Sequence, residues 1–396
     1  MKDLSAKLGL LFPDMVAWRR HLHRHPELSY EERHTSVFVA DRLNEWGATV
    51  RTNVGGYGVE GTIHGSLPGP VVALRADMDA LPIQDEKSCE YASTVPGVMH
   101  ACGHDGHTAA LLAVAKLLAD HRQSLAGTVK LLFQPAEELS PGGAAPMIAD
   151  GVLEGVDAVY GVHLWTPFPS GSVYSAPGPI MAAADEFTIR ITGRGGHGGL
   201  PHETVDSIVV GAHLVVNMQS IVSRSIDPTQ PCVVSVGKFI AGNGFNVIAE
   251  TCYINGTVRS FDVTVRDRIV ERLQQICVQT GEMFGADILL DYKPGYPPVI
   301  NDEAESERFF RVAGSLFGAD KTRRSPLIMA GEDFAYYLNR VPGCFMFVGA
   351  GNKEAGITAP HHHPKFDIDE SSMLQAAVLL ASMALDYLEG NRKPSS

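Results

Sequence analysis

The sequence predicts an α/β protein with a mixed, mostly parallel sheet covered by helices and with an inserted, smaller ferredoxin-like α+β domain. Three observations lead to this expectation. Apolar, β-rich runs alternate with helical stretches through the first half of the chain, a pattern typical of a parallel sheet covered on both faces. The middle of the chain instead follows the order βαββαβ, which is the ferredoxin-like unit. A length of 396 residues exceeds what one compact core usually holds.

In the first half, apolar runs end in polar residues. Pro70–Arg75, Gly127–Phe133 and Ala158–Val162 are the expected strands, and the helix Thr108–Asp120 lies between the first two. The residues that follow these strands are Asp77 and Asp79, then Glu137 and Glu138, then His163. Ligands bind beyond the carboxyl ends of the strands in such sheets, so we expect the functional site there.

A break at Pro177-Gly178-Pro179 precedes the inserted domain. Its expected elements, in order, are a strand at Glu186–Ile191, a helix at Thr204–Ser223, strands at Cys232–Ile240 and Thr251–Val258, a helix at Val263–Phe284 and a strand at Asp287–Tyr292. We therefore expect residues 184–293 to be a separate domain, inserted between two parts of the first domain at 1–183 and 294–396. A strand at Cys344–Val348 and a helix at Ser372–Leu388 complete the first domain.

Composition excludes several classes of protein. The chain has 32 Lys and Arg against 45 Asp and Glu, a net charge of −13, whereas a nucleic-acid binder carries a basic patch. The closest approach to a membrane span, Ala109–Ala119, is shorter than the roughly 18 apolar residues that a span needs, and the N-terminus lacks a signal-peptide pattern. Six cysteines without regular spacing do not indicate a disulfide framework. We expect a reduced, cytoplasmic protein that binds neither nucleic acid nor membrane.

Residue types that bind metals gather at the expected strand ends. Met99–Thr108 reads MHACGHDGHT, so Cys102 and His104 are separated by one glycine. Thiolate and imidazole both bind divalent transition metals, and the glycine lets the backbone bend so that the two side chains converge. Together with Glu138, His163 and a histidine of the 361–363 triplet, they form the inventory of a metal site.

Glu137 and Glu138 are expected to differ in role. Neighbouring residues on an extended backbone point to opposite sides. One carboxylate can then bind metal while the other faces the activated water as a general base.

Five segments carry a resemblance to a known family. They are His100–Thr108 (HACGHDGHT), Phe133–Glu138 (FQPAEE), Arg75–Pro82 (RADMDALP), Trp18–Leu28 (WRRHLHRHPEL) and Gly331–Tyr337 (GEDFAYY). In order and across essentially the whole chain, they resemble the M20 metallopeptidase superfamily, in the amidohydrolase branch of aminoacylases, hippurate hydrolases, auxin-conjugate hydrolases and N-acetyldiaminopimelate deacetylases. The resemblance implies a metal-binding α/β domain interrupted by a lid domain, through which the chain forms a homodimer or homotetramer.

The resemblance also implies roles for individual residues. Cys102 takes the metal-bridging place that an Asp fills in the rest of the superfamily. His104 and His163 complete the site of one divalent cation, Glu138 and His362 complete the other, and Glu137 is the general base. His361 remains an alternative to His362, because this chain has a triplet where the family usually has a single histidine. Mixed sulfur, nitrogen and oxygen ligands suit Zn²⁺, Mn²⁺, Co²⁺ or Ni²⁺.

Three further residues lie in the expected lid. His197, in the segment GRGGHGGLP, is implied to reach the partner subunit's active site and to stabilise the oxyanion of the reaction. Asn246 and Arg259 match substrate-binding positions, and the planar guanidinium of Arg259 suits a carboxylate. A structural ion pair remains the alternative role for Arg259.

The function implied is hydrolysis of the amide bond of small N-acyl-L-amino acids by metal-activated water, with Glu137 as base. Two alternatives stay open. One is a metal-independent thiol hydrolase, with Cys102 as nucleophile and His104 or His100 as base. The other is a non-enzymatic metal- or peptide-binding protein of the same fold.

Overall fold

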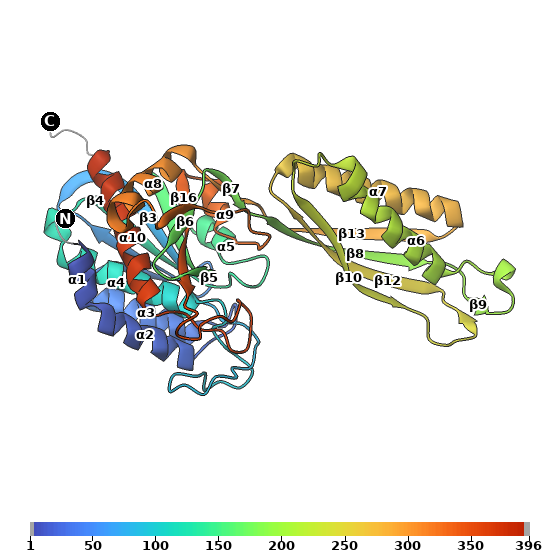
Figure 1. Cartoon of the computed structure of the whole chain (residues 1–396), viewed down its shortest axis with the longest axis horizontal. Coiled ribbons are helices and arrows are strands. Elements are labelled where there is room, and N and C mark those ends of the chain that lie inside the picture. Colours follow the sequence, from blue (N-terminus) through green and yellow to red (C-terminus); the bar gives the residue numbers. More distant parts are fainter. Residues whose placement is uncertain (1–3, 392–396) are drawn as a thin grey trace. The chain divides into compact units, whose positions relative to one another are not determined.

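A computed structural model describes residues 4–391, and these divide into two compact units (Figure 1). The first unit holds residues 1–178, 300–326 and 333–396, of which residues 1–3 and 392–396 are not described. The second unit holds residues 179–299 and 327–332. The second unit thus begins five residues before, and ends six residues after, the boundaries expected from the sequence, and it also takes up a short later segment.

The first unit is built on an eight-stranded mixed sheet of order β1-β2-β4-β3-β5-β16-β6-β15. The strands are β1 (Thr49–Val54), β2 (Gly58–His64), β3 (Leu67–Asp77), β4 (Ala126–Gln134), β5 (Ala158–Pro169), β6 (Val173–Ser175), β15 (Thr322–Arg324) and β16 (Gly343–Gly351). The four central strands, β4, β3, β5 and β16, run parallel, whereas β1, β2 and β6 add antiparallel pairs. The mixed, mostly parallel α/β sheet expected from the sequence is therefore confirmed.

Helices cover this sheet. They are α1 (Leu4–Leu10), α2 (Phe12–Arg24), α3 (Arg33–Glu45), α4 (His104–Asp120), α5 (Ala144–Ala149), α8 (Glu303–Phe317), α9 (Ala335–Leu338) and α10 (Ser371–Gly390). The helices α4 and α10 pack on each other and on β3 and β5. Their buried Ala and Leu side chains join those of the strands in one hydrophobic core. Burial of this kind is the main favourable term in folding.

Among the described residues, α10 is the one helix that is long and apolar enough to cross a membrane. It therefore approaches a membrane span more closely than Ala109–Ala119, the stretch expected from the sequence. Its most apolar 18-residue window is 61% buried inside the protein, and Ala376, Leu379 and Leu380 are fully buried in the core. This burial is typical of the core helix of a globular protein.

The strand β5 is longer than the sequence predicts. His163 was expected at its end, but the strand continues to Pro169. The neighbouring β3 pairs with β5 only as far as Gly161, whereas β16 continues alongside beyond that point. His163 therefore lies where one side of β5 loses its partner, and this opening leaves room for the site.

The second unit contains a four-stranded antiparallel sheet of order β10-β12-β8-β13. Its elements are β8 (Ala183–Thr192), β9 (Gly196–His197), α6 (Ser207–Ser220), β10 (Cys232–Ala241), β11 (Val247–Ile248), β12 (Thr251–Ser260), α7 (Val263–Phe284) and β13 (Asp287–Tyr296). Two short strands, β7 (Gly178–Met181) and β14 (Val299–Asn301), flank it in the sequence. This strand order with antiparallel neighbours is that of a βαββαβ unit.

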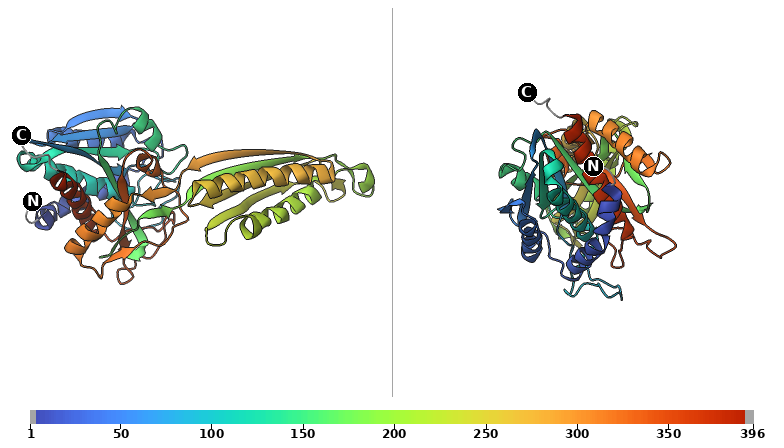
Figure 2. Two further views of the ribbon diagram at one scale, coloured as in Figure 1. Left: turned by 90° about the horizontal axis from the view of Figure 1, so that it is seen from above. Right: turned by 90° about the vertical axis from the view of Figure 1, so that its left-hand side faces the viewer.

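Local sequence explains the helices of the second unit. The Asp262 side chain accepts hydrogen bonds from the backbone N–H groups of Thr264 and Val265 at the start of α7. Gly285 ends the helix at φ 69°, a left-handed conformation that glycine adopts without strain. Both α6 and α7 pack on one face of the sheet (Figure 2), where alternate residues of β8, including Phe187 and Ile189, are buried.

Candidate functional site

The loop before α4 carries the first two site residues. Gly103 adopts φ 94° as the residue that precedes the helix, a conformation that costs any residue with a Cβ roughly 1–2 kcal/mol. The chain turns there, so that Cys102 and His104 on either side of it approach the same point. Both side chains are buried.

Hydrogen bonds orient the two buried histidines of the site. His104 Nδ1 donates to the backbone oxygen of Asp79 at 3.0 Å and lies 3.1 Å from its Oδ1. His163 Nδ1 donates to the backbone oxygen of Leu164 at 3.0 Å. When each ring is neutral, its Nε2 is the unprotonated nitrogen and can bind a metal, which is the usual arrangement of metal-binding histidines.

Two groups of three potential ligands share Cys102. The first group is Cys102, His104 and His163, and the second is Cys102, Glu138 and His362; within each group the ligand atoms all lie within 4.8 Å of one another. Cys102 Sγ is 3.6 Å from His163 Nε2, and Glu138 Oε1 is 3.3 Å from His362 Nε2. The structure thus brings together all five residues that the sequence nominates as ligands.

The donor set fits divalent cations. Among the described residues, none makes a hydrogen bond to the buried His104 Nε2 or Glu138 Oε1, although Glu138 Oε1 has an ion-pair contact with His362. Buried polar atoms without hydrogen bonds are costly unless something else satisfies them. The two atoms are 3.8 Å apart. A thiolate, three imidazoles and a carboxylate match the preferences of transition metals.

The pKa values reflect an excess of negative charge in the site. Burial and the neighbouring Glu138 and Glu137 carboxylates raise the pKa of the Cys102 thiol well above its usual range. Burial lowers the pKa of His104, but the carboxylates of Asp77 and Asp79 outweigh it and raise this pKa to about 10. A cation would offset the charge that produces both shifts.

The two adjacent glutamates do not lie on extended backbone, so the expectation that they point to opposite sides is wrong. Strand β4 ends at Gln134, and Ala136 adopts a left-handed φ of 52°, so the chain turns before Glu137. Both carboxylates approach His104 Nε2, Glu137 at 3.9 Å and Glu138 at 3.8 Å. They differ in their other neighbours, because only Glu138 also groups with Cys102 and His362.

Two histidines of the 361–363 triplet, His361 and His362, make different contacts. His362 adopts a left-handed φ of 63° and its N–H donates to the Ala101 carbonyl, which places its ring beside Glu138. His361 instead stacks on Trp165, with ring centroids 4.3 Å apart, and its Nε2 accepts the N–H of Thr166. The proton of the neutral His361 ring is then on Nδ1, 3.7 Å from Cys102 Sγ. Of the two histidines that the sequence left open, His362 has the ligand geometry.

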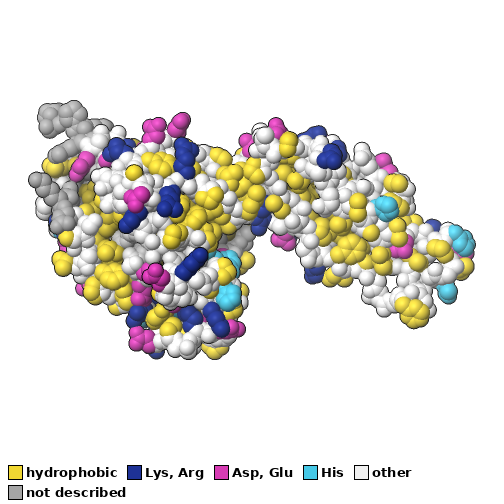
Figure 3. Space-filling model, viewed as in Figure 1, with side chains coloured by type: hydrophobic (Ala, Val, Ile, Leu, Met, Phe, Trp, Pro, Cys, Tyr) yellow, Lys and Arg dark blue, Asp and Glu magenta, His cyan; other side chains and the backbone are white. Residues whose placement is uncertain are grey.

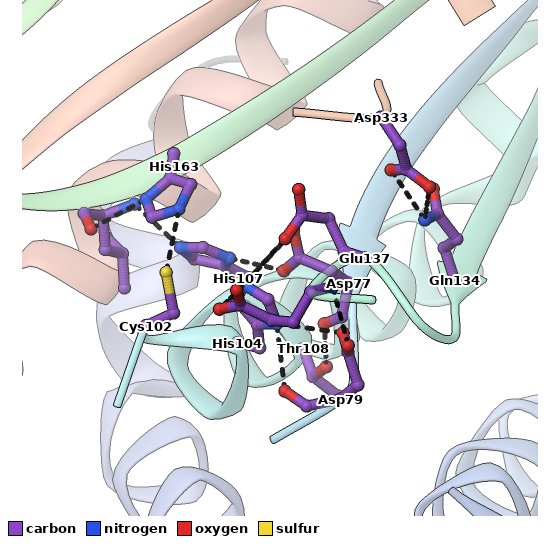
Figure 4. Close-up of polar contacts among 12 residues, drawn as sticks. Asp77, Asp79, Cys102, His104, His107, Thr108, Gln134, Glu137, His163 and Asp333 are labelled. Carbon is purple, nitrogen blue, oxygen red and sulfur yellow. Dashed lines mark hydrogen bonds and ion pairs between the residues drawn. The ribbon is translucent and has the colours of Figure 1, made fainter. Parts of the chain in front are cut away.

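A buried network of hydrogen bonds and ion pairs surrounds the candidate ligands (Figure 4). His107 Nε2 accepts the N–H of Leu164 and its Nδ1 donates to Asp77 at 2.6 Å, so both ring nitrogens are used. Asp77 also pairs with Arg75, which reaches Asp333 at 2.8 Å on its other side. His107 and Asp77 therefore support the cluster rather than complete it.

The remaining site residues expected from the sequence lie in the second unit. His197 is exposed on β9, opposite Val247 on β11, and its Nδ1 accepts the N–H of Gly199 at 3.0 Å, which leaves the ring proton on Nε2. Asn246 is exposed nearby, and its backbone oxygen accepts the N–H of Gly198. Arg259 is half-buried on β12 and donates to neutral oxygens, among them that of Met329 at 3.2 Å. His197 and Asn246 are thus neighbours within this unit.

Comparison with known proteins assigns the family. Residues 73–386 match the model described as peptidase family M20/M25/M40. The chain belongs to the M20 family. It is 50% identical to the putative amidohydrolase YhaA of Bacillus subtilis over 386 residues, 98% of each chain. It is also 50% identical to an N-acyl-L-amino acid amidohydrolase of Geobacillus stearothermophilus over 293 residues, 74% of this chain and 79% of that one.

A solved structure in the M20 family has the same fold. The Bacillus subtilis YXEP protein, a dinuclear metal-binding peptidase, superposes with a TM-score of 0.84 at 33% identity, covering 96% of this chain and 99% of that one. The M20 chain is thus an enzyme, a metal-dependent amidohydrolase or peptidase. The non-enzymatic alternative is set aside.

Sequence reasoning missed several residues that hold the site. The sequence places Asp77 and Asp79 beside the ligands and outside the ligand set, but it does not show which histidines they orient. It gives no indication of Glu32, which accepts the N–H of Ala136 at 2.7 Å. A signal existed for the first two, because they follow a predicted strand at alternate positions. None existed for Glu32, which is more than a hundred residues from its partner in the sequence.

Proposed function

We propose that this M20 chain is a binuclear metal-dependent amidohydrolase that cleaves the amide bond of N-acyl-L-amino acids. The observation that carries the proposal is the position of Cys102, which belongs to two separate groups of potential ligands. A shared thiolate of this kind suits two adjacent cations. The similarity to an N-acyl-L-amino acid amidohydrolase supports the substrate class.

Glu137 is the proposed general base. When bound, two divalent cations lower the pKa of water and polarise the amide carbonyl. The Glu137 carboxylate is nearly buried and does not group with Cys102 and His362 as Glu138 does. It accepts the proton of the attacking water and returns it to the leaving amine.

We further propose that the inserted domain, expected at residues 184–293, acts as a lid and as the surface for homodimer or homotetramer formation. In the described sheet β10 is an edge strand, and such edges are ready to pair with another chain. Apolar side chains reach the surface of this unit (Figure 3). On α6, β10 and the loop after β10 they are Ile208, Val209, Val216, Phe239, Ile240 and Phe245.

The lid residues are assigned to substrate recognition. His197 carries its ring proton on an exposed Nε2, which suits donation to a developing oxyanion. Asn246 lies beside it. Arg259 donates to neutral oxygens among the described residues, and a substrate carboxylate is a stronger partner for its guanidinium.

Metal removal tests the proposed function directly. We expect chelated enzyme to lose turnover of N-acetyl, N-benzoyl and indole-acetyl amino acids, and to regain it with Zn²⁺, Mn²⁺, Co²⁺ or Ni²⁺ near two equivalents per chain. The panel should include unblocked dipeptides, to separate an amidohydrolase from a peptidase. Preference for dipeptides, or full restoration at one equivalent, would contradict the proposal.

The role of His197 can be tested by mixing subunits. We expect His197→Ala to keep its metals and lose about 10²–10³-fold in kcat, the usual effect of removing one oxyanion donor. If His197 acts in the partner's site, a mixture of inactive Glu137→Gln and His197→Ala subunits should regain activity, because heterodimers hold one site with both residues intact. Confirmed subunit exchange without recovered activity would exclude action across the interface.

A further inference from the structure

A short segment between α2 and α3 contacts the site although the proposed mechanism does not use it. The segment is Ser29–Glu32, directly after the Trp18–Leu28 motif. The residues just before it run beside the chain that follows β3. There Leu28 pairs with Ala80, and the N–H of Ala80 donates to the backbone oxygen of Glu27 at 2.8 Å. The side chains of the segment reach the loop that follows β4.

Glu32 makes the most buried of these contacts. Its side chain is fully buried, and its Oε1 accepts the N–H of Ala136 at 2.7 Å and that of Tyr30 at 3.0 Å. Ala136 has a left-handed φ of 52°, a conformation that costs a residue with a Cβ roughly 1–2 kcal/mol. Without Glu32 the buried N–H of Ala136 would lose its acceptor, and the turn would lose the bond that compensates its strain.

Two neighbours hold the same loop at other points. The Tyr30 hydroxyl donates to the Leu139 carbonyl at 2.9 Å and accepts the N–H of Gly142 at 3.1 Å. The Ser29 hydroxyl donates to Asp79 at 2.7 Å. The same oxygen of Asp79 accepts the N–H of Glu138 at 2.9 Å. Hydrogen bonds from the segment thus reach the loop before and after the two glutamates.

We propose that the side chains of Ser29, Tyr30 and Glu32 form a positioning clamp, in which Glu32 fixes the turn at Ala136 and thereby aims the Glu137 carboxylate. The inference rests on the proposed function, since it takes Glu137 as the base. Glu137 is the residue after the clamped N–H, so a rotation at Ala136 displaces its carboxylate directly. Misplacing a reacting group by about 1 Å can cost about 10²-fold in rate.

The test uses three variants of the full-length enzyme. Glu32→Leu removes the acceptor while filling similar space, and Glu32→Gln keeps an oxygen in its place. Burial and the Asp79 carboxylate raise the pKa of Glu32 to about 7, so replacing it with an uncharged glutamine is a smaller change than at an exposed glutamate. Glu31→Gln, at the exposed neighbouring position, is the matched control.

We expect Glu32→Leu to lose about 10–10²-fold in kcat at unchanged KM and metal content. Glu32→Gln should stay within a few-fold of wild type, and Glu31→Gln should equal it. In metal-free enzyme, amide hydrogen exchange of residues 136–142 should be faster in Glu32→Leu than in Glu31→Gln. Should Glu32→Leu fail to fold, Tyr30→Phe gives the second readout, with faster exchange over the same residues and a smaller loss of kcat.

Unchanged kcat per folded Glu32→Leu enzyme, or Glu32→Gln as impaired as Glu32→Leu, would overturn the clamp. So would unchanged exchange in the available variant. Glu137→Gln separates this failure from failure of the proposed function: if that variant stays active, Glu137 is not the base, whereas the exchange result still reports whether the turn is held.

Discussion

Glu137→Gln is expected to keep its full complement of metal and to lose about 10²–10⁴-fold in kcat, the contribution typical of a general base. The substitution keeps the shape of the side chain and removes only its ability to take a proton. The Glu137 carboxylate lies 3.9 Å from His104 Nε2 but outside the group of Cys102, Glu138 and His362. Metal content by elemental analysis and kcat on an N-acyl amino acid are the two measurements.

Glu138→Gln is the matched control, since it makes the same chemical change one residue away. Glu138 is 3.3 Å from His362 Nε2 and belongs to the group around Cys102. We expect this variant to lose metal and to regain part of its turnover at high metal concentration. Equal metal loss in both variants would contradict separate roles for the two glutamates.

The central strands and long helices were predictable because their sequences are strongly patterned. The helix Val263–Phe284 was expected at the bounds that the structure shows for α7, since Asp262 and Gly285 mark its ends. The hairpin β1–β2 and the helices α2 and α3 were not anticipated. The full length of β5 could not be predicted from local sequence either. Its second half pairs with β16 beyond His163, and β16 lies about 180 residues later in the chain.

The ligand set was predictable from spacing and from the family resemblance, but the contacts that orient the ligands were not. The five residues are of types that bind metals and can be recognised one by one. The choice between His361 and His362 depends instead on a left-handed residue and on stacking against Trp165. Such features arise from tertiary contacts and leave no local pattern in the sequence.

The geometry also bears on the thiol hydrolase alternative. A nucleophilic cysteine needs a lowered pKa, whereas burial and the nearby carboxylates raise that of Cys102. The two bases considered for it, His104 and His100, have no hydrogen bond to the thiol: within residues 4–391, no partner is found for His104 Nε2 or for either ring nitrogen of His100. The histidine nitrogens within 4 Å of Cys102 Sγ belong to His163 and His361.

Cys102→Ser is therefore expected to reduce metal content and turnover together, the latter toward background, because the substitution removes the ligand that both groups share. A serine hydroxyl is a much poorer bridging ligand than a thiolate, which is soft and charged. Elemental analysis after dialysis, followed by kcat measured with added metal, gives the two quantities. Full metal occupancy in this variant would show that Cys102 is not a ligand.

Cys102→Asp distinguishes a ligand from a nucleophile. Its carboxylate has two oxygens that can bridge two cations, and the resemblance places an Asp at this position in the rest of the superfamily. If Cys102 is a ligand, the Asp variant should bind more metal than the Ser variant and should keep measurable, chelator-sensitive turnover. If Cys102 is instead a nucleophile, both variants should be equally inactive whatever their metal content, because neither side chain can form the thioester that such a mechanism requires.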